Sequence, residues 1–120
     1  MSKKDTGIRY ALKSGYRAMI DAYKSENPNA KVSDFYRELD IIYLVALGCT
    51  AKQFKEKFDV ESVRDNLTPQ LKACILAMQR ANTVYIEDGL SFEERHEKLE
   101  SLYSRKWADK IYEEHILLEA

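Results

Sequence analysis

The side chains that most often carry enzyme or metal chemistry are few and scattered in this sequence. His96 and His115 are its only histidines, and Cys49 and Cys74 are its only cysteines. Nucleophilic catalysis needs Ser, Cys or Thr beside a base, and metal binding needs ligands at suitable spacing. The histidines match neither HExxH nor an i, i+4 pair, and the cysteines form no CxxC. We therefore expect no catalytic residue, no metal site and no cofactor.

The paired carboxylates do not change that expectation. Glu93-Glu94 and Glu113-Glu114 are adjacent pairs on expected helices, where consecutive side chains point about 100° apart and do not face one another. No glycine-rich motif that would hold a phosphate is present. The sequence therefore predicts a protein that is not an enzyme and that has no small-molecule substrate. We also expect both cysteines to be dispensable for activity.

Composition narrows the class of protein further. The 120 residues are 45 % hydrophobic and 32 % charged, with a formal net charge of −1, which is typical of a globular domain. The length predicts one domain over residues 1–120. Dedicated nucleic-acid binders usually carry a basic excess, which is missing here. No apolar run reaches the length of a signal peptide or of a membrane span. We therefore expect a cytoplasmic location and no membrane contact.

Apolar residues recur at three- and four-residue steps along most of the chain, which predicts helices. Thr50 with Gln53 and Ser91 with Glu94 match the capping box, Thr68-Pro69 is a typical helix start, and Gly48 is a typical helix end. With four Gly and two Pro, the chain has few of the residues that punctuate β-structures. We expect an all-α fold, a compact bundle of about five helices with a long C-terminal helix. The expected helices span residues 8–25, 33–47 (capped by Ser33 or Asp34), 50–58, 68–88 and 91 onward.

Residues 34–58 also resemble a helix-turn-helix, with Gly48 in the turn. Lys52, Lys55 and Lys57 on the second helix would then contact DNA phosphates. Against this interpretation, Leu44 occupies a position where such motifs have a small residue, and the second helix lacks an Arg or Asn stripe for base edges. DNA binding is therefore the alternative hypothesis, and an ordinary helical hairpin explains the same residues.

Polar residues in two unusual places are candidates for structural or interaction roles. Arg64, Asp65 and Asn66 form an irregular stretch before a helix, where Arg64 is expected to pair with a carboxylate and Asp65 or Asn66 to shape the turn. Asn82 falls on an apolar helix stripe, so its amide must find partners, with a backbone carbonyl or Arg64 as candidates.

The last helix carries an apolar stripe that includes Leu99, Leu102, Tyr103, Trp107 and Ile111. A stripe of this length is often completed by a second subunit. We therefore expect a homodimer through Trp107 and Ile111. The competing expectation is that the helix breaks near Ser104 and that its end folds back onto its own domain.

Four short blocks resemble the helical region that follows the DNA-binding domain in phage and prophage KilA-N proteins. They are LGCTAKQF at 47–54, VRDNLT at 63–68, QRANT at 79–83 and GLSFEER at 89–95. The chain contains no KilA-N domain, so DNA binding does not follow from the resemblance. The resemblance implies a phage or mobile-element origin and a module that contacts another protein, as a regulator or as an inhibitor of a host factor. Arg64, Asp65 and Asn82 lie in matching blocks.

Overall fold

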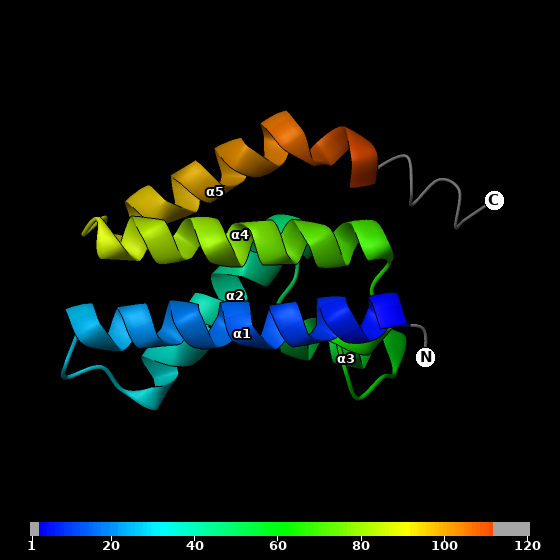
Figure 1. Ribbon diagram of the computed structural model, residues 1–120, viewed down its shortest axis with the longest axis horizontal. Helices are drawn as coiled ribbons and strands as arrows, with labels where there is room; N and C mark the ends of the chain where they lie inside the picture. The colour runs from blue at the N-terminus through cyan, green and yellow to red at the C-terminus, as the bar shows by residue number, and fades with distance from the viewer. Residues whose placement is uncertain (1–2, 112–120) are drawn as a thin grey trace.

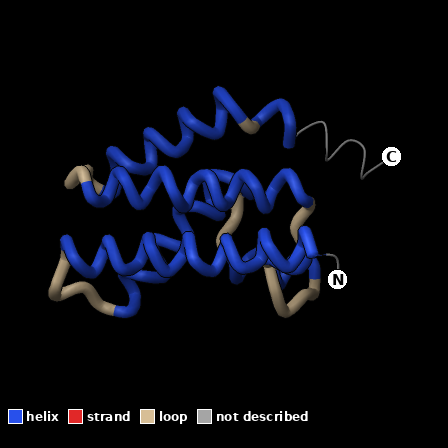
Figure 2. The backbone as a smooth tube through the Cα atoms, viewed as in Figure 1, coloured by secondary structure: helices blue, strands red, loops and turns tan. Residues whose placement is uncertain are grey.

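The computed structural model describes residues 3–111 and, of the side chains, those of residues 7–111. This part of the chain is helical and contains no strand (Figures 1 and 2). The predicted all-α bundle of about five helices is confirmed. Its elements are α1 (Lys3–Glu26), α2 (Val32–Leu47), α3 (Ala51–Phe58), the 3-10 turn η1 (Arg64–Asn66), α4 (Pro69–Glu87) and α5 (Phe92–Lys106).

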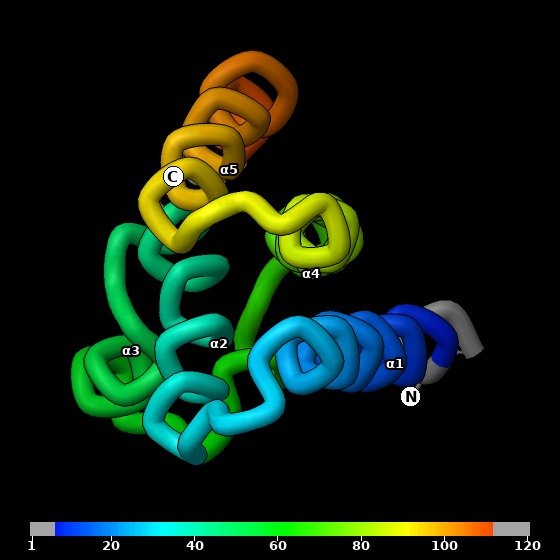
Figure 3. The backbone as a smooth tube through the Cα atoms, turned by 90° about the vertical axis from the view of Figure 1, so that its left-hand side faces the viewer, coloured from blue at the N-terminus to red at the C-terminus, as the bar shows by residue number. Residues whose placement is uncertain are grey.

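The helices surround α2 on several sides. Helices α1 and α4 run side by side in the same direction, and α5 returns in the opposite direction along α4 (Figure 1). Helix α2 contacts α1, α4 and α5. Viewed from the end of the molecule, α1 and α3 lie on opposite sides of α2 (Figure 3).

Local signals explain most helix boundaries. Thr50 Oγ1 accepts a hydrogen bond from the Gln53 backbone N–H at 3.2 Å, and Gln53 Oε1 accepts one from the Thr50 N–H at 2.9 Å. Ser91 and Glu94 repeat this pattern at the start of α5. Gly48 ends α2 with φ of 75°, a conformation that glycine adopts without strain. The predicted capping boxes and the glycine stop are therefore confirmed.

Two predicted helix starts are wrong. Helix α1 begins at Lys3, five residues before the predicted start at Ile8. Helix α2 begins at Val32, so neither Ser33 nor Asp34 is its N-cap. The Asp34 carboxylate instead accepts a hydrogen bond from the Lys31 N–H at 2.8 Å, which satisfies that amide from inside the first turn.

The core lies between α1, α2, α4 and α5. Gly15 permits a close approach of α1 to α4, because a Cβ atom at this position would lie 3.2 Å from Leu76 Cδ1 and 2.6 Å from Gln79 Oε1. None of the described helices is long and apolar enough to cross a membrane. The largest fully buried apolar side chains are Leu12, Met19, Ile41, Ile42, Ile75, Met78 and Leu99.

The C-terminal helix is interrupted at Trp107. Helix α5 ends at Lys106, Trp107 takes φ −122° and ψ −30°, and residues 108–111 are helical again. The bend brings Ile111 onto the core of its own chain, where it is 2 % exposed, and Trp107 is half-buried against the same core. Ile111 is therefore not the exposed dimer contact that its stripe predicted. Any part of the predicted last helix beyond residue 111 lies outside the described residues, as does His115.

Candidate functional site

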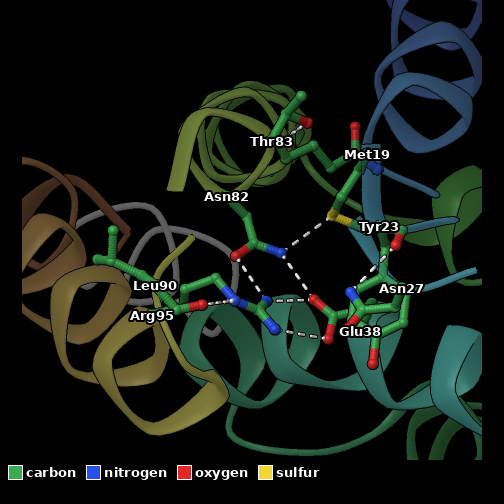
Figure 4. A network of polar contacts seen from close by, with 9 residues as sticks. Met19, Tyr23, Asn27, Glu38, Asn82, Thr83, Leu90 and Arg95 are labelled. Atoms are coloured by element: carbon green, nitrogen blue, oxygen red, sulfur yellow. Dashed lines mark hydrogen bonds and ion pairs between the residues drawn. The ribbon is translucent and has the colours of Figure 1, made fainter. Parts of the chain in front are cut away.

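Asn82 lies at the centre of a buried polar network to which four helices contribute (Figure 4). Helix α2 provides Glu38, α4 provides Asn82, and α5 provides Arg95. Helix α1 provides Met19, whose sulfur lies 3.3 Å from the Asn82 amide nitrogen. Glu38, Asn82 and Arg95 are exposed by 1 %, 0 % and 3 %, so the network is shielded from water.

The three polar side chains satisfy one another. Asn82 Nδ2 donates to Glu38 Oε1 at 3.1 Å, and Arg95 Nη1 donates to Asn82 Oδ1 at 3.1 Å. Arg95 Nη2 donates to Glu38 Oε2 at 3.0 Å, and its Nη1 also bonds Glu38 Oε1. Arg95 Nε donates to the Leu90 carbonyl at 3.4 Å. The network therefore forms a bidentate ion pair with an amide bridge, the strong geometry for arginine and carboxylate.

This network holds helices together and offers no unmet group to a ligand. The prediction of Arg64 as a partner of Asn82 is wrong, because Glu38 and Arg95 hold the Asn82 amide. A sequence signal for these partners exists. Glu38 lies four residues before the buried Ile42, and Arg95 lies four residues before the buried Leu99. Both charged residues therefore occupy core-facing helix positions, where a charge requires a partner.

The loop before α4 is tied to α1 through Asp65. Arg9 Nη2 lies 2.9 Å from the Asp65 carboxylate, and Asn66 Nδ2 donates to the Ser62 carbonyl at 2.7 Å. The arginine–carboxylate pair of this loop is therefore Arg9–Asp65, and no ion pair of Arg64 is found among the described residues. Asn66, one of the two residues predicted to shape the turn, does so with its side chain.

A groove of about 800 Å³ runs between α1 and the opposite wall formed by α2, α3 and residues 61–64. We call it the basic groove, since both of its walls carry cations. Its α1 wall includes Lys13, Arg17 and Lys24, which are spaced so that they share one helix face. Its opposite wall includes Lys55 of α3 and Arg64 of the loop. Arg64 is thus placed in the groove, a position that the sequence alone did not indicate.

The floor of the basic groove is formed by buried residues that include Ile20, Val63, Tyr43 and Gln79. Burial raises the pKa of the Tyr43 phenol, although the nearby Arg64 cation acts in the opposite direction. Gln79 is 3 % exposed, and its Oε1 has no hydrogen-bond partner. A buried amide oxygen without a partner is costly and is uncommon in folded proteins. This oxygen is covered by α1, since a Cβ atom at Gly15 would lie 2.6 Å from it.

The three lysines proposed for DNA contact do not all line the basic groove. Lys52, Lys55 and Lys57 are all exposed on α3. Only Lys55 lines the basic groove, whereas the Lys57 ammonium lies 5.4 Å from the centre of the Phe58 ring. The eight-residue α3 is short for a recognition helix. Substitutions at Lys55 and Lys57 therefore make a matched pair that separates the groove from α3 as a whole.

The two cysteines differ strongly in environment. Cys74 is fully buried and Cys49 is half-buried, and burial raises the pKa of the Cys74 thiol to about 12. Because the thiolate is the reactive form, we expect a disulfide reagent at pH 8 to modify Cys49 alone in the folded protein. Counting thiols before and after denaturation in guanidinium checks this expectation. The Cys49→Ser variant should then show almost no reaction until unfolded, and rapid modification of that folded variant would contradict the burial of Cys74.

Comparisons with models of protein families, with curated proteins and with solved structures gave no match. Among residues 3–111, no group of three His, Cys, Asp or Glu side chains is placed to hold a metal ion. The features available for a function are therefore those of this chain's own surface, where the basic groove combines a cavity with cations on both walls.

Proposed function

We propose that this chain is a non-enzymatic interaction module that binds a protein partner in the basic groove. The resemblance to KilA-N-associated helical regions adds the proposal of a phage or prophage origin, with a role as a regulator or as an inhibitor of a host factor. The site lies on the folded surface of one chain and requires no cofactor.

The observation that carries the proposal is the length of the groove along α1. Its lining residues on this helix extend from Tyr10 to Lys24, a span of about 21 Å at the rise of an α-helix. A site this long suits a polymer segment better than a compact metabolite. Tyr10, which is 74 % exposed, stands at one end, and exposed tyrosines are common anchors in protein interfaces.

DNA binding is retained as the alternative function, supported by the exposed lysines of α3. A titration with duplex DNA at increasing salt separates the two functions, because phosphate binding weakens steeply as salt rises. Typical non-specific binders associate with DNA at protein concentrations of about 10 µM. At that concentration and 50 mM salt, we expect this protein to form no complex with duplex DNA.

The experiment that tests the proposal is site-specific photocrosslinking in a bacterial lysate. Ser14 lies on the α1 wall of the groove and is exposed. Glu97 on α5 is also exposed and lies outside the groove, so it serves as the matched control position. We expect a crosslinked protein from position 14 that excess unlabelled wild-type protein competes away. Equal crosslinking from both positions, or none from position 14, would contradict the groove as the binding site.

A further inference from the structure

We propose that the occupant of the basic groove is an acidic segment of the partner, bound along α1 with an apolar side chain turned toward the floor. This inference rests on the proposed function and adds the chemistry of the partner. Asp and Glu residues of this segment would face both walls of the groove. The other candidate occupant, a single-stranded nucleic acid, is an outcome of the test.

Charge is concentrated in the groove. Lys13, Arg17, Lys24, Lys55 and Arg64 line it, against two carboxylates, although the whole chain has a formal net charge of −1. The cations come from both walls, so an anionic segment between them faces positive charge on two sides. Such complementarity steers association and selects against cationic partners.

The dimensions fit a short stretch of polypeptide. An extended strand rises about 3.3 Å per residue, so the span of about 21 Å along α1 accommodates about six residues. The half-buried Leu39 and Tyr16 also line the groove and offer a surface for one or two apolar side chains.

A nucleic acid fits the same groove less well. Single-stranded nucleic acids bind where exposed aromatic rings stack on bases along a cationic channel. Tyr10 at one end of the groove is 74 % exposed, but Tyr16 is half-buried and Tyr43 is 5 % exposed, so exposed rings do not follow one another along the channel. Asp21 and Glu61 also line the groove and would face the phosphates. A peptide can place neutral residues opposite these carboxylates, whereas a phosphate backbone has a charge at every step.

The inference is tested by selection from a display library of random twelve-residue peptides on the immobilised full-length protein. We expect the enriched peptides to contain more Asp and Glu than the starting library, with at least one apolar residue among them. Binding of an enriched peptide is then measured by fluorescence anisotropy at 50 mM and 200 mM salt, beside an oligothymidine probe of twelve nucleotides.

Matched charge reversals locate the binding site. Because exposed ion pairs each change affinity severalfold at most, we expect the Arg17→Glu, Lys55→Glu double variant to bind the peptide about tenfold more weakly. Lys55→Glu alone should weaken binding severalfold, whereas Lys57→Glu, which makes the same charge change on the same helix outside the groove, should leave affinity within twofold. Circular dichroism melting of each variant confirms that these exposed substitutions leave the fold intact.

Several results would overturn the inference. These are no enrichment of peptides, enrichment of neutral or basic peptides, equal loss of binding in Lys57→Glu, or tighter binding of oligothymidine than of the selected peptide. The proposed function fails separately, because it depends on crosslinking from position 14. A partner that crosslinks there through a neutral or basic segment would retain the proposed function and remove the acidic occupant.

Discussion

Replacement of Glu38 by alanine is expected to lower the free energy of unfolding by about 3–5 kcal/mol. The substitution leaves Arg95, which is 3 % exposed, as a charge inside the core without its carboxylate. It also removes the acceptor of the Asn82 amide. Breaking a buried ion pair on one side costs more than the pair itself contributes, because the remaining charge stays desolvated. Equilibrium unfolding in guanidinium chloride, analysed at a constant m value, measures the difference.

Two further variants show whether the loss comes from the orphaned charge. Glu97→Ala, at an exposed position of α5, should change stability by no more than about 0.5 kcal/mol. The triple variant Glu38→Met, Asn82→Leu, Arg95→Met removes all three polar groups and fills their volume with apolar atoms. We expect it to recover most of the stability that Glu38→Ala loses, since apolar replacements of buried ion pairs are often neutral or stabilising.

The triple variant also tests what the network contributes to specificity. Glu38, Asn82 and Arg95 come from α2, α4 and α5, and the bidentate geometry permits one register between these helices. We hypothesise that the apolar variant keeps its stability but packs less uniquely, which would appear as poorer dispersion in its NMR spectrum. A loss below about 1 kcal/mol in Glu38→Ala, or a triple variant less stable than the single one, would contradict this account.

Replacement of Ile111 by alanine is expected to cost about 2–3 kcal/mol of folding free energy. Ile111 is 2 % exposed and belongs to the core cluster of its own chain, so its truncation leaves a cavity where the chain returns after Trp107.

The concentration dependence of melting separates this account from a dimer contact. A side chain buried within one chain affects the melting temperature equally at all protein concentrations, whereas a dimer contact makes the effect vary with concentration. We expect parallel shifts for Ile111→Ala from about 1 to 100 µM, and no shift for Asp109→Ala at an exposed neighbouring position. A concentration-dependent shift would restore Ile111 to an intermolecular interface. Trp107 is half-buried, so a homodimer contact through this residue stays a prediction.

The helices and most of their boundaries could be predicted from the sequence because their causes are local. A capping box such as Thr50 with Gln53 needs only residues three positions apart, and Gly48 ends a helix through its own backbone freedom. Apolar periodicity likewise marked Leu99 as a residue on a core-facing stripe, and it is fully buried. These signals act within one or two helical turns, so neighbouring elements hardly alter them.

Partners and surfaces could not be read in the same way, because they join residues far apart in the chain. Glu38 and Arg95 lie 57 positions apart, and nothing in the local sequence of either residue identifies the other. The basic groove depends on how far α1 stands from α3 and the following loop, a distance set by packing through α2 and α4. The bend at Trp107 has the same origin, since burying Ile111 on the core takes the place of a continuous helix. The apolar periodicity of the sequence thus determined which helix faces are buried, and tertiary packing determined which residues those faces contact.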